Sequence, residues 1–188
     1  MQTVTFKLKS LTPLLMHNGR LANPLDPFQK DLKKVTGKRG KTDADVEEIS
    51  RREFFGGIYW NSELGPHIPD MILQRAVEEG AKKFKLGKQF KSAVFVDGDS
   101  KLEYSGPRNV EELYNDQTHV SREMVKVGTS KCLRTRPMFP IWELTTKIVF
   151  DESVVEEQQV QASLEMAGRF VGIGDWRPRY GRFSVSKV

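Results

Sequence analysis

The chain has 188 residues, of which 38% are hydrophobic and 29% are charged, and these proportions predict a packed core and exclude global disorder. The single cysteine, Cys132, excludes an intramolecular disulfide, and no Cys/His spacing indicates a zinc site. A net charge of +5 favours a polyanionic partner. Since the sequence has no signal-peptide pattern and no apolar run of membrane-spanning length, we expect a cytoplasmic protein.

The first part of the chain predicts a strand, a basic segment and a helix. Apolar and polar residues alternate over 4–8, which is typical of a half-buried strand. From Lys30 to Lys41, six basic residues face one acid and are interspersed with two glycines, which predicts a flexible basic loop. The mixed-charge segment 43–55 favours a short helix, and 58–60 a short strand.

The middle of the chain contains the clearest helical pattern. A helix is expected to begin at Pro69–Asp70 and to end at Gly87, because apolar residues recur on one face at Leu73, Ala76, Val77, Ala81 and Phe84. Gly80 lies in the same stripe, which indicates close packing against a sheet. A buried strand at 93–96, a helical turn at 110–114 and an irregular basic region at 118–140 are expected to follow.

The last part of the chain repeats the order strand, helix, strand. A strand is expected at 145–150. Ser153 and Glu156 have the spacing of a capping box at the start of the helix. Phe183 and Val185 point the same way on the final strand.

This order of elements predicts an α+β fold with two halves that each resemble a βαβ unit. We expect a ferredoxin-like sheet, of the RNA-recognition-motif type, with helices on one face. The whole of 1–188 then forms a single domain with two charged insertions, at about 20–62 and 99–140.

The C-terminal segment combines glycines, aromatic residues and arginines between a helix and a strand. Glycine lets backbone N–H groups approach a phosphate, the arginine guanidinium matches phosphate oxygens, and aromatic rings stack on bases. The combination predicts nucleic-acid contacts from Gly172, Gly174, Trp176, Arg177, Arg179, Tyr180 and Arg182. The alternative is a Gly/Pro turn with solvated arginines, in which Trp176 packs in the core.

Two further basic stretches are candidates for phosphate contact. The first contains Lys33, Lys34, Lys38 and Arg39. The second contains Lys131, Arg134 and Arg136, and it is followed by the aromatic residues Phe139 and Trp142. Flexible basic side chains suit phosphate contacts that carry no sequence readout, but they are equally consistent with a solvated surface that has no partner.

Three motifs resemble the RAMP superfamily, whose members include backbone subunits and processing ribonucleases of CRISPR systems. The first strand leads into Leu11–Gly19, which has the family's Thr-Pro-Leu sequence followed by a histidine and a glycine. An Ile-Pro pair at 68–69 enters the first long helix. The chain ends in a Gly-x-Gly loop and in Tyr180–Phe183, which resemble the family's glycine-rich loop and last strand, although 175–179 contains less glycine than that loop usually does.

The resemblance implies a core that binds single-stranded RNA along a groove and self-associates along the strand. It also implies a catalytic alternative, because processing ribonucleases of the superfamily often use a histidine base, and metal-dependent members carry a cleaving aspartate after the first strand. The matching positions here are His17 and Asp26. In the simpler interpretation, His17 ends the first strand and Asp26 belongs to an ordinary Asp-Pro turn.

We therefore expect non-catalytic binding of single-stranded RNA or single-stranded DNA, by a homo-oligomer or by a subunit of a nucleoprotein complex. No cofactor and no metal are expected, because the sequence contains no Walker loop, nucleophile elbow or zinc protease helix. The alternatives are an endoribonuclease and a RAMP-like protein-interaction subunit, or decoy, that docks into a larger effector complex.

Overall fold

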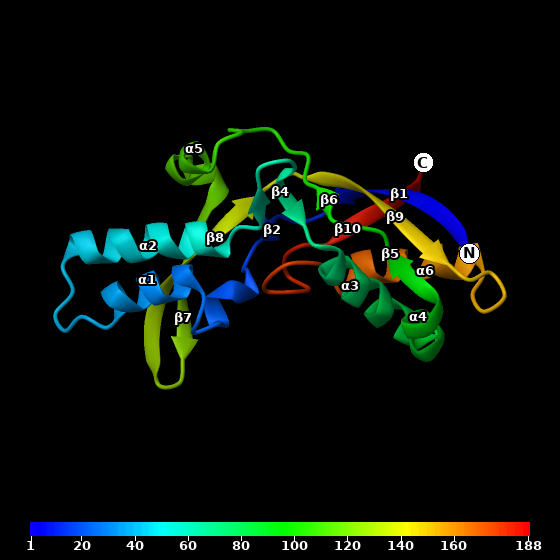
Figure 1. Ribbon diagram of the computed structural model, residues 1–188, viewed down its shortest axis with the longest axis horizontal. Helices are drawn as coiled ribbons and strands as arrows, with labels where there is room; N and C mark the ends of the chain where they lie inside the picture. The colour runs from blue at the N-terminus through cyan, green and yellow to red at the C-terminus, as the bar shows by residue number, and fades with distance from the viewer. The chain divides into compact units, whose positions relative to one another are not determined.

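The computed structural model describes residues 1–188, apart from the side chain of Val127. The chain divides into two compact units. Unit 1 consists of Met1–Leu14, Trp60–Ser105 and Pro140–Val188, and unit 2 consists of Leu15–Tyr59 and Gly106–Phe139. Both units combine helices with antiparallel strands, so the fold is α+β (Figure 1). Among the residues described, no helix has the length and apolar character needed to cross a membrane.

Unit 1 is built on a four-stranded antiparallel sheet with the strand order β10-β1-β9-β5. Its strands are β1 (Gln2–Ser10), β5 (Val94–Val96), β9 (Glu143–Phe150) and β10 (Phe183–Lys187). In the centre of the sheet, Leu8 of β1 lies opposite Leu144 on one side and Val185 on the other. The alternation predicted for the first strand is confirmed, because Val4, Phe6 and Leu8 are buried.

Two helices cover one face of this sheet, α3 (Asp70–Lys82) and α6 (Glu157–Phe170) (Figure 1). They touch at Gly80, where a Cβ atom would lie 2.1 Å from the carbonyl oxygen of Ser163. The close packing expected at Gly80 is therefore against a helix and not against a sheet. At the start of α6, Glu156 and not Ser153 is the N-cap, and it forms a capping box with Gln159.

The helix α3 ends at Lys82, before the predicted stop at Gly87, and a separate helix, α4 (Gly87–Ala93), begins at that glycine. Between the two helices, Lys85 has a left-handed backbone conformation with φ of 63°. Phe84 therefore does not continue the buried stripe, and its side chain is 43% exposed. A small sheet formed by β3 (Trp60–Asn61), β4 (Gly65–Ile68) and β6 (Ser100–Lys101) completes unit 1.

Unit 2 contains a three-stranded antiparallel sheet with the order β2-β8-β7. Its strands are β2 (Leu14–Leu15), β7 (Val120–Val127) and β8 (Ser130–Phe139). Its helices are η1 (Gly19–Ala22), α1 (Pro27–Thr36), α2 (Asp43–Gly57), α5 (Val110–Asn115) and η2 (Gln117–His119). The predicted helices at 43–55 and 110–114 are thus confirmed.

Two predictions for unit 2 are wrong. The segment expected to be a flexible loop at Lys30–Lys41 belongs largely to α1, because Asp26 caps the helix and Leu32 and Val35 bury its inner face. The region expected to be irregular at 118–140 is the β7–β8 hairpin, whose turn contains Gly128 with φ of 61°. Its basic side chains therefore project from a regular strand ladder.

Candidate nucleic-acid interface

The C-terminal segment between α6 and β10, here called the arginine loop (residues 171–182), is closed by its own backbone. Gly172 N–H donates to the carbonyl of Ala167 at 2.8 Å, and Ile173 N–H donates to the carbonyl of Gly181 at 2.9 Å. Gly181 N–H donates to the carbonyl of Pro13 at 2.7 Å, which fixes the end of the loop to the segment after β1. These bonds hold the loop in a defined conformation.

The glycines at the two ends of the arginine loop serve this closure. Gly172 has φ of 73° and Gly181 has φ of 71°, a left-handed conformation that L side chains rarely adopt. A Cβ atom on Gly172 would lie 2.8 Å from the carbonyl oxygen of Tyr180. Gly172 was expected to bring backbone N–H groups close to a phosphate, but the space beside it is filled by the loop itself. Gly174 is also left-handed, with φ of 77°.

The two aromatic residues of the arginine loop lie against one another. The ring centroids of Trp176 and Tyr180 are 6.0 Å apart with an interplanar angle of 52°, and both side chains are half-buried. The backbone between them is bridged by a hydrogen bond of 3.2 Å from Tyr180 N–H to the carbonyl of Trp176. Both rings therefore keep some exposed surface, and the contact between them restricts their orientation.

The three arginines of the loop differ in their surroundings. Arg177 and Arg179 are exposed. Arg182 is half-buried, and its backbone N–H donates to the hydroxyl of Thr12 at 2.9 Å, while its carbonyl accepts from Leu11 N–H at 2.8 Å. Arg182 therefore anchors the loop, whereas Arg177 and Arg179 have guanidinium groups accessible to an anion.

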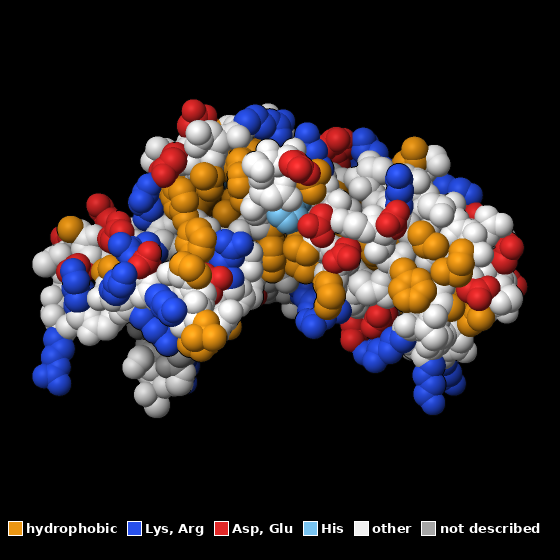
Figure 2. Space-filling model, in the orientation of Figure 1, with side chains coloured by type: hydrophobic (Ala, Val, Ile, Leu, Met, Phe, Trp, Pro, Cys, Tyr) orange, Lys and Arg blue, Asp and Glu red, His pale blue; other side chains and the backbone are white. Residues whose placement is uncertain are grey.

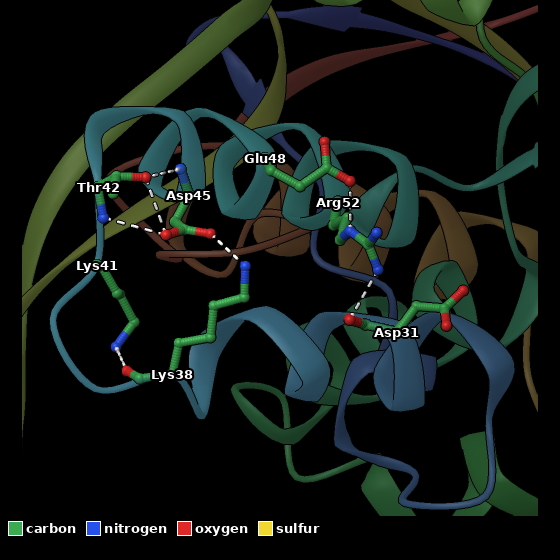
Figure 3. Close-up of polar contacts among 7 residues, drawn as sticks. All are labelled: Asp31, Lys38, Lys41, Thr42, Asp45, Glu48 and Arg52. Carbon is green, nitrogen blue, oxygen red and sulfur yellow. Dashed lines mark hydrogen bonds and ion pairs between the residues drawn. The ribbon is translucent and has the colours of Figure 1, made fainter.

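The first basic stretch lies in the α1–α2 hairpin of unit 2 and is braced by acidic side chains (Figure 3). Lys34 Nζ pairs with Asp31 at 2.6 Å, and Lys38 Nζ pairs with Asp45 at 2.6 Å. The remaining candidates, Lys33 and Arg39, are exposed. Half of the predicted cations in this stretch are therefore already neutralised within the hairpin.

Asp45 is the centre of that bracing. Its carboxylate accepts from Lys38 and from the backbone N–H of Thr42, and it forms a capping box at the start of α2 (Figure 3). The hydrogen bond from Lys38, followed by those from Thr42, lowers the pKa of Asp45 from 3.8 to about 2. The ionised carboxylate is thus favoured in the folded state.

We expect Asp45 to make the stability of the hairpin depend on pH. A folded-state pKa below the unfolded value stabilises the protein above about pH 4, and the contribution is lost as the pH falls to about 2. The difference in free energy of unfolding between wild type and Asp45→Asn should shrink across that window, as measured by urea unfolding. Asp43→Asn is the control, and a difference that persists at the lower limit would mean that ionisation is not the cause.

The second basic stretch lies on β8 and is mostly structural. Lys131 is exposed, whereas Arg134 and Arg136 are half-buried. Arg134 forms an ion pair with the buried carboxylate of Glu53 on α2. Burial lowers the pKa of the Arg134 guanidinium, but the hydrogen bond and the charge of Glu53 outweigh it and raise that pKa. The aromatic residues expected beside this stretch, Phe139 and Trp142, are core residues, each 1% exposed.

Glu53 was not identified from the sequence, although it organises this part of unit 2. Its second carboxylate oxygen accepts from the backbone N–H of Thr135 at 2.8 Å. The hydroxyl of Thr135 then donates to Ser50 at 2.8 Å, and Arg122 Nε also donates to Ser50 at 3.2 Å. Helix α2 and the β7–β8 hairpin are joined through this polar network. In the sequence Glu53 follows Arg51 and Arg52, so it reads as part of a solvated charged run and nothing marks it as buried.

The two catalytic alternatives occupy different local settings. Asp26 is the N-cap of α1, where its side chain accepts from Phe28 N–H at 2.9 Å, as the ordinary Asp-Pro interpretation predicts. His17 is exposed, and its carbonyl accepts from the hydroxyl of Tyr59 at 3.2 Å. His119, another histidine of this unit, is 4% exposed, and its Nδ1 lies 3.0 Å from the carbonyl oxygen of Met138. Within the described residues, no group of three or more His, Cys, Asp or Glu is arranged to hold a metal ion.

The lysines at the end of α3 and in α4 were not identified from the sequence as a binding surface. This segment contains Lys82, Lys83, Lys85, Lys88 and Lys91, all of which are exposed. The apolar spacing placed Phe84 in the buried stripe of a helix that ends at Gly87, and no role was assigned to the lysines. Five lysines without an acid in ten residues were the signal that indicated a basic surface.

The fold and the arginine loop define an α+β protein with two exposed arginines on a hydrogen-bonded loop. The chain matches no protein-family model and no curated protein. Among solved structures, the crystal structure of Cmr6 from Pyrococcus furiosus aligns with 97% of this chain and 97% of that chain, with 11% sequence identity and a TM-score of 0.39.

Proposed function

We propose that this protein binds single-stranded nucleic acid without cleaving it, and that the arginine loop is the principal contact. One observation carries the proposal: a loop closed by backbone hydrogen bonds displays Arg177 and Arg179 beside the ring pair of Trp176 and Tyr180. Exposed guanidinium groups next to partly exposed rings suit a strand whose phosphates and bases are both accessible. Because neither feature reads base edges, little sequence preference is expected.

The arrangement of unit 1 supports the finer form of the proposal, a ferredoxin-like core of the RAMP type. The four-stranded sheet contains β1, β5, β9 and β10, numbered 1 to 4 in chain order. Across the sheet, the order of these strands is 4-1-3-2. In the chain, helix α3 lies between the strands of the first half, β1 and β5, and α6 lies between those of the second half, β9 and β10. The Thr12-Pro13 motif and the arginine loop, about 170 residues apart, are hydrogen-bonded to each other.

On this proposal, residues 1–188 form one RAMP-like domain, and unit 2 contains its charged insertions. The exposed cations Lys33, Arg39 and Lys131 then supply additional phosphate contacts. Self-association along the strand, and assembly into a larger nucleoprotein complex, are parts of the same proposal.

The proposal is tested by fluorescence anisotropy with labelled single-stranded RNA, single-stranded DNA and duplex DNA, titrated at about 50 and 200 mM salt. Replacing Arg177 and Arg179 by glutamine should weaken binding to single strands. It should also reduce the slope of log affinity against log salt by about 1.4, since each lost phosphate contact contributes about 0.7. The matched control is the double variant Lys101→Gln with Lys147→Gln, which removes two exposed charges from strands β6 and β9 of unit 1.

The same samples, run on a denaturing gel, separate the alternatives. A shortened probe would favour the endoribonuclease, and His17→Ala and Asp26→Ala would then show which residue is needed. Equal weakening in the control pair would mean that net charge, and not the arginine loop, governs binding. Absence of binding to every probe would move the function to a protein partner.

A further inference from the structure

A second basic surface, here called the lysine groove, lies at the turn between α3 and α4 in unit 1. It is a shallow depression lined by Lys82, Lys85, Gly87, Lys88, Gln89 and Lys91. Figure 2 shows Lys and Arg side chains projecting from the region where α4 lies in Figure 1. Four ammonium groups around one concave surface attract an anion that carries several charges.

The backbone of the turn brings these lysines together. The left-handed conformation of Lys85 reverses the chain after α3, with φ of 63°. The absence of a side chain at Gly87 lets the stem of Lys82 pack against the start of α4, since a Cβ atom there would lie 2.9 Å from its Cγ. Lys82 pairs with Glu79 at 2.5 Å, but Lys85 and Lys88 form no ion pair with any residue that the structure describes.

The lysine groove follows the C-terminal end of α3, which packs on α6, the helix that leads into the arginine loop. The pKa of Glu79 on α3 is lowered, first by the hydrogen bond from Lys82, and also by the positive charges of Lys82, Arg177 and Lys91. The carboxylate of Glu79 therefore interacts electrostatically with one cation of the arginine loop and with two cations of the groove. Both basic segments therefore extend from one packed pair of helices, α3 and α6.

An exposed aromatic residue accompanies the lysines. Phe84 is 43% exposed and lies between Lys83 and Lys85 in the turn. It lines a second shallow depression together with Leu86 and residues at the start of α6. Because Phe84 is exposed and adjoins Lys83 and Lys85 in the chain, its ring can stack a base of a strand whose phosphates contact the lysines.

We infer that the lysine groove binds the phosphate backbone of the same single strand that contacts the arginine loop, with Phe84 available to stack a base. This inference rests on the proposed function and extends it, because the footprint then runs from the arginine loop along α3 to α4. A strand that reaches only the arginine loop makes fewer phosphate contacts than one that also fills the groove, so affinity should increase with strand length.

The test uses the full chain and labelled single strands of about 4 to 16 nucleotides, the range of site sizes for such surfaces. Lys85→Gln with Lys88→Gln should bind the shortest strand as wild type does and lose the affinity gained with the longer strands. Its salt slope on the longest strand should decrease by about 1.4. The pair Lys101→Gln with Lys147→Gln again controls for net charge, and far-UV circular dichroism verifies that every variant is folded.

The outcomes separate this inference from the function on which it rests. If the Lys85/Lys88 pair binds every length with the wild-type slope while the Arg177/Arg179 pair is weakened, the groove is not part of the footprint and the proposed function stands. If only the lysine pair is weakened, at all lengths, the arginine loop is not the principal contact and the extended footprint is wrong. Displacement of the long strand by poly-glutamate at equal charge concentration would assign the groove to an acidic protein partner instead.

Discussion

Replacing Glu53 by alanine is expected to lower the free energy of unfolding by about 3–5 kcal/mol, which is typical of breaking a buried ion pair from one side. Glu53 is 4% exposed, and its carboxylate accepts from both Arg134 and the backbone N–H of Thr135. Its removal leaves a half-buried guanidinium and a buried N–H group without their acceptor. Urea unfolding at neutral pH measures the loss.

The matched control is Glu48→Ala, earlier on the same helix. Glu48 pairs with Arg52 at the surface, at 2.6 Å, so its loss should cost about 0.3–0.5 kcal/mol. Adding Arg134→Met to Glu53→Ala should recover part of the stability, because the unpaired charge is removed as well. If Glu53→Ala costs no more than Glu48→Ala, the ion pair does not join α2 to the hairpin.

The elements that the sequence predicted well are those whose burial follows a local period. The first strand and the helix α3 each show an apolar pattern that repeats every two residues or every three to four, because one face of each lies on the core. Helix α1 was missed because only Leu32 and Val35 of its ten residues are buried, and lysines dominate the rest. The basic composition therefore led to the prediction of a loop where the structure has a helix that begins after its Asp26 cap.

The β7–β8 hairpin was missed for a different reason. The inward side chains of the hairpin include the polar residues Ser121 and Thr135, so no apolar alternation marks the strands. Thr135 can be buried because its partners lie far away in sequence: its N–H donates to Glu53, 82 residues away, and its hydroxyl donates to Ser50, 85 residues away. No local pattern can reveal such a partner.

For the arginine loop, the sequence predicted a binding segment but did not distinguish the roles of its residues. Its residue types predicted a binding surface from the sequence, and the structure places Arg177 and Arg179 on its exposed side. The sequence could not separate these two from Arg182, which is half-buried where the loop backbone is hydrogen-bonded to Thr12, 170 residues away. For the same reason, the glycines expected to serve a ligand were not recognised as closing the loop.

Gly181→Ala is expected to lower the free energy of unfolding by about 3 kcal/mol and to weaken binding to single strands. A Cβ atom at Gly181 would lie 1.8 Å from the carbonyl oxygen of Ile173, on a residue with φ of 71°. Overpacking of this kind costs about 1–3 kcal/mol, and the left-handed conformation adds about 1–2 kcal/mol. The displaced backbone also loses its hydrogen bond to Pro13, so Arg177 and Arg179 are no longer held in place.

Gly98→Ala separates the two causes, because Gly98 has φ of 77° but no atom within 4 Å of the position that a Cβ atom would occupy. It should therefore cost about 1 kcal/mol through backbone strain alone and leave the affinity unchanged. Urea unfolding and fluorescence anisotropy on the same preparations measure both effects. If Gly181→Ala loses stability as expected and still binds single strands fully, a rigid arginine loop is not required for binding, and the exposed lysines must carry the affinity through charge alone.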